Sequence, residues 1–350
     1  ARRPAAEALA GIGLAPVTFK PKDALTVFSS NAVAVGHAAL LVTRLEQLMD
    51  LADLVAALAM EAVSANTSII DPAVAVARAS SGQEATSANL RAALSGSTRA
   101  GTGPGISVQD PLSFRVIPQV HGALRDIVDS FTDAVLSELN ATADNPMVDL
   151  ATGRVLSNGN FHPMNLALVA DSVRVGLAHV GMLCDRRMGQ LWDNLVSSIL
   201  PQEGKADVAA LARGGRPEMA GLGLRYPAAS RYTRLRHLAN PITLDVPVLD
   251  LSVEDHATNA PEALDLVEEA IYLVEDLLAV ELLLAIPTLG HPTPLADLGE
   301  GTRSLAAGVV ETLDGLASDT QPDAVHRLVR KAMKQGSPGF REATGRSHRS

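Results

Sequence analysis

The chain has 350 residues, of which 47% are hydrophobic and 19% are charged, a composition that excludes extensive disorder and can fill a large buried core. Its formal net charge of −10 opposes nucleic-acid binding, because that function needs a cationic surface that neutralises phosphates. Aromatic residues make up only 3%, so the core must consist mainly of Ala, Leu and Val, which suit closely packed long helices.

The first half of the chain predicts three helices followed by a loop. Residues 31–64 contain no proline, and their apolar residues recur every three to four positions, as in a long helix. Shorter patterns of the same kind cover residues 72–79 and 83–94. Residues 97–111 are rich in Gly, Ser, Thr and Pro and carry no apolar period, so we expect an irregular loop there.

The second half predicts three more long helices and one small hairpin. The helices are expected over residues 118–140, 162–191 and 262–285. Residues 147–157 have the pattern of two short apolar strands joined by Ala-Thr-Gly. Glycines and prolines interrupt residues 201–261, so no element is predicted there.

Together these elements describe one all-α domain, a bundle of long helices with a small β-hairpin near residues 147–157. The sequence has no repeat of solenoid length and no change of composition that would divide the chain. The domain is predicted to span residues 1–336, and the polar residues 337–350 are predicted to form a disordered tail.

The segment over residues 107–123, SVQDPLSFRVIPQVHGA, has features that helix propensity alone would not require. It combines Gln-Asp-Pro, an arginine and Pro-Gln-Val-His-Gly. It resembles the active-site segment of the aromatic amino acid lyases, the histidine and phenylalanine ammonia-lyases and related aminomutases, whose motif runs roughly QDPYSLRxxPQVxGA.

Four more segments resemble the same family, and they occur in the family's order. Residues 22–25 (KDAL) resemble KEGLAL, 138–146 (ELNATADNP) resemble ExNxATDNP, 158–162 (NGNFH) resemble GGNFH, and 254–256 (EDH) resemble QEDH. Five matches in the right order with similar separations favour this family. The resemblance implies a long-helix bundle of the ammonia-lyase/fumarase-like type. The related fumarases and aspartases are disfavoured, because their GSSxMPxKxN signature is missing.

The resemblance also implies a binding site for a carboxylate. Arg115 occupies the position of the family arginine that pairs with the substrate carboxylate, and a guanidinium offers a planar fork of donors suited to that role. Gln109 would offer its amide either to the substrate or to the turn before Pro111. Phe161 matches the pocket aromatic of the family, although a Phe that opens a buried helix can also serve core packing.

Glu254 is the candidate catalytic residue. It matches the acidic residue that histidine lyases carry in the pocket, where a carboxylate beside an arginine or an amine can accept or relay a proton. A structural role for an acidic side chain at a helix N-terminus is compatible with the same position.

Two candidate binding positions depart from the family pattern. Ser29 stands where the family has an asparagine, and Leu112 stands where it has a tyrosine. Leucine neither donates nor accepts a hydrogen bond, so the pocket is predicted to be less polar than an ordinary ammonia-lyase site. Because each lost partner removes transition-state stabilisation, the chemistry is expected to have diverged.

The electrophile of the family is a methylidene-imidazolone ring made from an Ala-Ser-Gly triad, and this sequence contains no such triad. We therefore expect no cofactor encoded in this chain, and the ring is expected only if a partner chain supplies it. The order of the segments implies that the sequence begins a few tens of residues after the place of the triad. The catalytic tyrosine loop of the family, which lies earlier still, is missing as well.

The remaining reactive side chains do not suggest a second kind of site. His121, His162 and His256 lack metal-ligand spacing, so no metal is expected, and His121 and His256 are predicted to be hydrogen-bonded structural histidines. The single cysteine, Cys184, is predicted to be a buried structural thiol, which suits a reducing cytoplasm. The longest apolar run, residues 277–286, is short for a bilayer span and contains a glutamate, so a soluble protein is predicted.

Three hypotheses follow for the function. The first is the C-terminal subunit of a split, divergent lyase-like enzyme, with an N-terminal partner subunit that supplies the missing segment and with a tetrameric helical core. Its reaction would be an elimination, an amino shift or a related addition on an amino acid or another carboxylate-bearing substrate. The second is a non-catalytic scaffold that retains the lyase core. The third is a fragment of a longer lyase, which a first residue other than Met permits.

Overall fold

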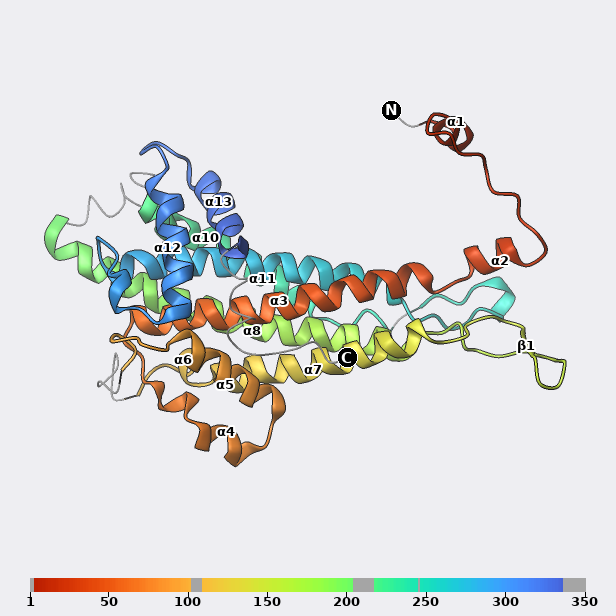
Figure 1. Cartoon of the computed structure of the whole chain (residues 1–350), viewed down its shortest axis with the longest axis horizontal. Helices are drawn as coiled ribbons and strands as arrows, with labels where there is room; N and C mark the ends of the chain where they lie inside the picture. The colour runs from red at the N-terminus through yellow and green to blue at the C-terminus, as the bar shows by residue number, and fades with distance from the viewer. Residues whose placement is uncertain (1–2, 102–108, 204–216, 245, 336–350) are drawn as a thin grey trace.

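Four long helices lie side by side and form the body of the molecule (Figure 1). They are α3 (Ala32–Ala62), α7 (Ile117–Leu139), α8 (Met164–Glu203) and α11 (Ala260–Leu289). The computed structural model describes residues 3–101, 109–203, 217–244 and 246–335. Within these ranges the predicted all-α bundle and its long helices are confirmed.

α3, α8 and α11 begin at the same end of the bundle, and α7 runs in the opposite direction, so the segments that connect the long helices gather at the two ends (Figure 1). One end, here called the hairpin end, holds α2 (Asp23–Phe28) and the predicted hairpin. The hairpin pairs β1 (Met147–Asp149) with β2 (Arg154–Leu156) in antiparallel register. Beyond this end, α1 (Ala5–Ala10) extends away from the bundle and has no buried residue.

Shorter elements from both halves of the chain cover the opposite end of the bundle, here called the cap end (Figure 1). The 3-10 turns among them are η1 (Thr67–Ile70), η2 (Pro217–Met219) and η4 (Leu295–Asp297). The α-helices are α4 (Pro72–Arg78), α5 (Ser81–Ala93), α6 (Leu112–Arg115), α12 (Glu300–Asp314) and α13 (Pro322–Gln335).

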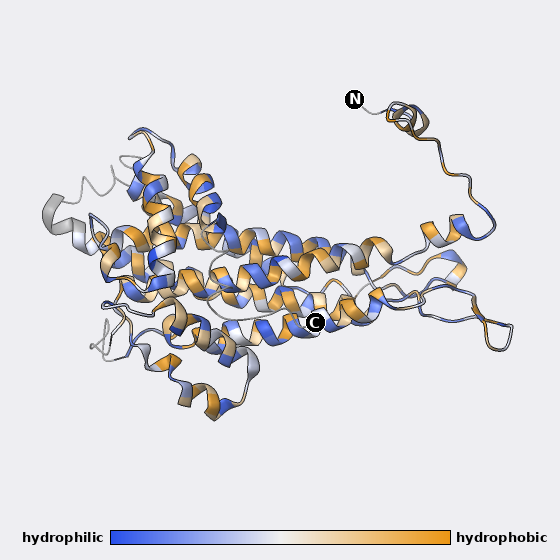
Figure 2. Cartoon of the chain, viewed as in Figure 1, coloured by the Kyte–Doolittle hydropathy of each residue, from blue (hydrophilic) through white to orange (hydrophobic). Residues whose placement is uncertain are grey.

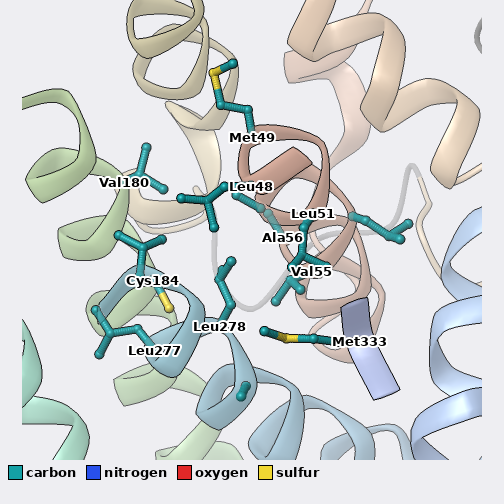
Figure 3. Packing of buried hydrophobic residues seen from close by; sticks show 14 of the residues in the cluster. Leu48, Met49, Leu51, Val55, Ala56, Val180, Cys184, Leu277, Leu278 and Met333 are labelled. Carbon is teal, nitrogen blue, oxygen red and sulfur yellow. The ribbon is translucent and has the colours of Figure 1, made fainter. Parts of the chain in front are cut away.

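α11 is the central helix of the bundle. It packs against α8, α3, α10 and α13, and every residue from Leu273 to Ile286 is buried. The second half of α3, from Leu51 to Ala62, is buried in the same way. A helix buried on all faces needs apolar residues on all faces, which accounts for these runs of Ala, Leu and Val. Figure 3 shows aliphatic side chains of α3, α8 and α11 directed toward one another, as the low aromatic content predicts.

Two glycines allow α5 and α7 to cross in direct backbone contact. A Cβ atom on Gly82 would lie 2.1 Å from the carbonyl oxygen of Gly122, and one on Gly122 would lie 2.4 Å from the backbone nitrogen of Gln83. Asp126, one turn after Gly122, accepts hydrogen bonds from the Gly82 N–H (2.8 Å) and the Ser81 hydroxyl (3.0 Å) at the start of α5. Gly122, in the Pro-Gln-Val-His-Gly motif, therefore serves helix packing.

The segment for which no element was predicted contains a further helix. α10 (Ala220–Leu238) packs on α11 and α8, and the short turn η3 (Asp250–Ser252) follows it. Pro227 inside α10 lacks an N–H group and interrupts the helical signal of the sequence, so tertiary packing rather than propensity holds this helix. Its buried side includes Leu222, Ala228, Leu235 and Leu238.

The predicted ends of the last two long helices differ from the observed ones. α8 continues beyond residue 191 to Glu203, and α11 continues through Pro287 to Leu289. A proline in the final turn removes one backbone hydrogen bond, and the helix continues past it to Leu289. The predicted tail at residues 337–350 and most of the predicted loop at 97–111 lie outside the described residues, and the single-domain boundary at residue 336 stays a prediction.

Two helical stretches are long and apolar enough to cross a membrane by length and composition, Asp23–Ala62 and Met164–Ser198. The most apolar window of the second is 61% buried within the bundle, as in the core helix of a soluble protein, whereas that of the first is only 24% buried. Val33 and Leu40, on the first half of α3, are 85% and 71% exposed. Figure 2 shows apolar residues along this helix. The described residues of the chain do not cover this apolar surface.

Candidate active site

The structure divides the candidate site residues between the two ends of the bundle (Figure 1). The cap end holds Gln109, Leu112 and Arg115, and the hairpin end holds Ser29, Phe161 and Glu254. α7 runs from one end to the other, and its 23 residues span about 35 Å. A single chain therefore does not bring Arg115 and Glu254 into one pocket, which the order of the motifs in the sequence does not reveal.

Arg115 is the last residue of the short helix α6 and is half-buried. Its Nε atom donates a hydrogen bond to the carbonyl oxygen of Asp110 (2.7 Å), which fixes the direction of the guanidinium. Asp110 is held in turn, because its Oδ2 atom accepts from the Asn66 N–H (2.7 Å). Arg115 forms no ion pair with any carboxylate in the described part of the chain. A half-buried guanidinium that is oriented by a backbone carbonyl and has no carboxylate partner in the described residues can bind an external carboxylate.

The two other cap-end candidates are exposed. Leu112, which begins α6, has 60% of its surface in contact with solvent, and Gln109 precedes it on the same surface. Leu112 offers only apolar surface at a position that resembles the tyrosine of the family motif. The cap-end candidates thus combine one oriented cation with an exposed apolar side chain.

At the hairpin end, polar contacts join three of the segments that resemble the lyase family. Lys22 donates from Nζ to Asp144 Oδ2 (2.6 Å), which connects KDAL to the ATADNP segment. Asn158 of NGNFH donates its N–H to Asn145 Oδ1 (3.0 Å). Ser29 is exposed at the end of α2, where its N–H donates to the carbonyl oxygen of Leu25 (2.8 Å). These segments are therefore neighbours in space as well as similar in sequence.

A row of three rings joins the fourth segment to this group. Phe161 and His162 have ring centroids 4.8 Å apart, and His162 meets His256 edge to face at 5.4 Å. Phe161 is half-buried and lies before the start of α8, so it is not a core residue of that helix. His256 is exposed, and its described contact is with the His162 ring, which differs from the predicted hydrogen-bonded structural histidine.

Glu254 lies in a tight loop that precedes α11, and its side chain is exposed. Its backbone pairs with that of Leu249, with Leu249 N to Glu254 O at 2.8 Å and the reverse bond at 3.3 Å. Between these residues Asp250, Leu251 and Ser252 all have positive φ angles. Because α11 begins only at Ala260, the alternative role of Glu254 as an acidic residue in the first turn of a helix is wrong.

A buried charge network, which was not predicted from the sequence, links α3, α5 and α7. Asp53 accepts from Arg125 Nη2 (2.5 Å) and from Asn89 Nδ2 (3.0 Å), and its other oxygen lies 2.8 Å from His121 Nδ1. Burial lowers the pKa of His121, so its ring is neutral, and the predicted structural role of this histidine is confirmed. Burial alone would raise the pKa of Asp53, but the Arg125 and His121 side chains hold it below its usual value.

A second buried pair joins α8 to α11. Arg187 donates from Nε and Nη2 to the two carboxylate oxygens of Glu281 at 2.6 and 3.0 Å, and both side chains are fully buried. Cys184, one turn earlier on α8, is also buried. Burial and the nearby Glu281 raise the pKa of its thiol well above the usual value, so the predicted structural thiol is confirmed. The only sequence signal for this pair is a charge inside each apolar helix.

The sequence lacks the triad from which the methylidene-imidazolone ring forms. Arg115 and Glu254 lie at opposite ends of the bundle, so the described residues of one copy do not bring both side chains to one such group. In the same part of the chain, no three His, Cys, Asp or Glu side chains gather in a way that could hold a metal ion.

The helical fold and the five segments that resemble the aromatic amino acid lyases agree with the comparison with known proteins. Residues 1–311 match the family model for aromatic amino acid lyases, so the chain belongs to the aromatic amino acid lyase family. It is 33% identical over 301 residues to the histidine ammonia-lyase of Anaeromyxobacter sp. (strain K), which covers 84% of this chain and 57% of that protein. It is 32% identical to the histidine ammonia-lyase of Symbiobacterium thermophilum, over 90% of this chain and 60% of the relative.

Solved structures share the fold. The tyrosine aminomutase of Streptomyces globisporus superposes with a TM-score of 0.82 at 24% identity, over 97% of this chain and 66% of that one. The histidine ammonia-lyase of Trypanosoma cruzi gives a TM-score of 0.80 at 23% identity, over 98% and 62% of the two chains. This chain thus spans about three fifths of the length of these relatives.

Proposed function

We propose that this chain is the C-terminal subunit of a split, divergent ammonia-lyase-like enzyme that acts on an amino acid or another carboxylate-bearing substrate. The observation that carries this proposal is Arg115, a half-buried arginine oriented by a backbone carbonyl and without a described carboxylate partner, within a segment similar to that of a lyase. Such an arginine is suited to the carboxylate that all substrates of this chemistry carry.

The separation of the candidate residues supports a site formed between copies of the chain. If two bundles pack side by side in opposite directions, the cap end of one copy meets the hairpin end of the other, and Arg115 can approach Glu254 of a neighbour. The long helices carry exposed apolar side chains that such packing would cover. They include Val33, Leu40, Leu136, Leu139, Leu168 and Val175. A tetrameric helical core is the assembly we propose.

In this site each residue has one role. Arg115 holds the substrate carboxylate, while Leu112 and Phe161 form apolar walls, and Gln109 and Ser29 offer hydrogen bonds. An elimination breaks a carbon–nitrogen bond and a neighbouring carbon–hydrogen bond and forms a carbon–carbon double bond, so the amine leaves and a group must accept the proton. We assign the role of proton acceptor to Glu254. The reaction is an elimination, an amino shift or a related addition.

An N-terminal lyase-like subunit would supply the triad and the tyrosine loop that this sequence lacks. The test is co-expression of the chain with a candidate partner that carries Ala-Ser-Gly, followed by a search for arylacrylate absorbance after addition of aromatic amino acids. Arg115→Ala should lower kcat/KM by about 100-fold through loss of a charge-assisted contact, whereas Arg327→Ala on the exposed face of α13 should leave it unchanged. A well-folded oligomer that binds no such partner would contradict the split-enzyme proposal.

The second candidate function is a non-catalytic scaffold that retains the lyase core. It is favoured by the missing triad and by Leu112, an exposed apolar side chain where a lyase-like site would hold a hydroxyl. The two functions differ in the partner, because a scaffold would join a chain that itself holds a complete site. A cytoplasmic location suits both functions, since the buried Cys184 is a free thiol.

A further inference from the structure

The last two turns of α10 line a surface hollow of about 660 Å³ whose lining contains none of the candidate site residues. We call it the α10 hollow. Its lining residues all carry polar or cationic side chains, and none of them is acidic. They are Ser230, Thr233, Arg234, Arg236, His237 and Asn240. The hollow therefore has no carboxylate among its lining residues, although the chain has a formal net charge of −10.

The arginines of α10 differ in whether they are neutralised. Arg225 pairs with Asp185 (2.9 Å), Arg231 with Asp276 (2.6 Å) and Arg234 with Glu269 (2.7 Å). Those three carboxylates lie on α8 and α11, so the pairs hold α10 against the bundle. Arg236 is exposed and has no carboxylate partner in the described ranges, and it is a lining residue of the hollow.

Arg236 and His237 are also not needed to cap the end of α10. The carbonyl oxygens of both residues accept backbone hydrogen bonds, from the N–H groups of Ala239 (3.3 Å) and Asn240 (3.2 Å). Arg174 of α8 donates to the carbonyl oxygen of Leu238 and to that of Asn240. With these carbonyls satisfied, the side chains of Arg236 and His237 are available to a ligand.

We propose that the α10 hollow binds a small organic anion with two or more adjacent anionic oxygens, carried by phosphate or carboxylate groups. Ser230, Thr233, Arg234 and His237 follow one another at intervals of three, one and three residues, so they share one face of the helix. Arg234 uses Nε and Nη2 for Glu269 and retains the N–H groups of Nη1. Two guanidinium groups and an imidazole then face one ligand, and the hollow has the volume of a small-molecule site.

The test is isothermal titration of the full chain with pyrophosphate and, separately, with citrate at low ionic strength. The double variant Arg236→Gln, His237→Gln should weaken binding at least about tenfold, because charge-assisted hydrogen bonds are lost. Glu269→Gln should strengthen binding, since it frees the paired N–H groups of Arg234. The matched control, Arg327→Gln on α13, removes the same charge away from the hollow and should leave the affinity unchanged.

Each outcome decides the proposal. Binding of both anions assigns the hollow to anionic oxygens in general, and binding of one alone assigns it to phosphate or to carboxylate. The proposal is overturned if the wild-type chain binds neither anion, if the double variant retains wild-type affinity while its circular dichroism spectrum is unchanged, or if Arg327→Gln weakens binding as much as the double variant. Because the readout is binding to this chain, it does not depend on lyase activity.

Discussion

At the scale of single residues, the bundle places charges where the chain is most apolar. Arg187 and Glu281 are fully buried and satisfy each other through two hydrogen bonds. Asp53 is equally buried and is held by His121 and Arg125. A buried ion pair gives little net stability compared with apolar side chains of the same size, but removal of one partner leaves an uncompensated charge. These residues therefore specify how the helices pair.

The first prediction concerns the Arg187–Glu281 pair. Glu281→Leu should lower the free energy of unfolding by about 3–5 kcal/mol, because it leaves the guanidinium buried and unpaired. The double variant Arg187→Met, Glu281→Leu should recover most of that loss. Urea unfolding followed by circular dichroism measures both. As a control, replacement of the exposed Arg327 and Asp323 pair should leave the unfolding midpoint where it is. A double variant no more stable than the single one would contradict the explanation.

The buried His121 predicts how the free energy of unfolding depends on pH. Its Nε2 atom has no hydrogen-bond partner among the described residues, and its side chain lines a cavity of about 10 Å³ between α3, α7 and α8. Burial lowers its pKa in the folded chain, whereas in the unfolded chain the pKa is about 6.5. As the pH falls below about 6.5, the unfolded chain binds a proton that the folded chain does not, so stability is lost on acidification. The other cavity residues are Leu48, Met49, Ala52, Leu124, Leu177 and Val180.

The measurement is the free energy of unfolding of the wild type and of His121→Gln between about pH 7 and pH 5. The loss on acidification should be smaller in the variant, by up to about 1.4 kcal/mol for each pH unit below the pKa of the unfolded chain. His162→Gln, which changes a half-buried ring at the hairpin end, serves as the control and should retain the wild-type slope. If the free energy of unfolding fell equally with pH in His121→Gln and in the wild type, His121 would not be the cause of the acid destabilisation.

At the scale of elements, close approach of α5 and α7 depends on two residues without side chains. Gly82 and Gly122 bring the two backbones into contact, and Asp126 satisfies the first amides of α5. At the other side of the bundle, Arg330 of α13 lies 3.8 Å from the centre of the Tyr272 ring and pairs with Asp276 (3.2 Å). α13 is thus attached to α11 by a cation–π contact and an ion pair.

Substitution of glycine should have opposite effects at two sites. Gly122→Ala places a Cβ atom 2.4 Å from the backbone nitrogen of Gln83, so α5 must move, and we expect a loss of about 1–3 kcal/mol in the free energy of unfolding. Gly308→Ala in α12 meets no atom within 4 Å and should stabilise by about 0.5–1 kcal/mol through helix propensity. Thermal unfolding of the two variants and of the wild type measures both changes in stability. Equal effects of both substitutions would contradict the close-contact role of Gly122.

At the scale of the whole molecule, the length of the bundle sets the distance between the two groups of candidate residues. α7 separates Arg115 from the hairpin end by its whole length. The outward faces of α3, α7 and α8 meanwhile expose apolar side chains along the bundle (Figure 2). Burial of these faces against other copies would remove apolar surface from water and join opposite ends in one step.

The prediction at this scale is an oligomer that depends on α8. Leu168 and Val175 lie seven residues apart, and both are exposed on this helix. Replacement of both with glutamate should convert the assembly to smaller species in light scattering coupled to size-exclusion chromatography, because like charges would be buried at the interface. Val76→Glu on α4 introduces a charge at an exposed apolar residue at the cap end and is the control. A monomeric wild type would contradict the proposed core.

Much of the fold follows from local sequence. The apolar period of 3.6 residues predicts α3, α7, α8 and α11, and the turn at Ala-Thr-Gly predicts the hairpin, because both patterns depend on neighbours along the chain. α10 escapes prediction because Pro227 and its arginines hide the apolar period, and its helix depends on packing against α11. The segments that carry Arg115 and Glu254 are recognisable in sequence as parts of a lyase-like site.

Tertiary structure alone decides where those segments lie. It gathers four of the five lyase-like segments at the hairpin end and leaves Arg115 at the cap end, because the direction in which each helix runs is set by packing of the bundle. It also pairs Asp53 with His121 and Arg187 with Glu281, charges whose partners are 68 and 94 residues away. The sequence by itself determined the four long helices, the hairpin and the family, since these depend on local pattern, whereas the structure determined α10 and which side chains meet.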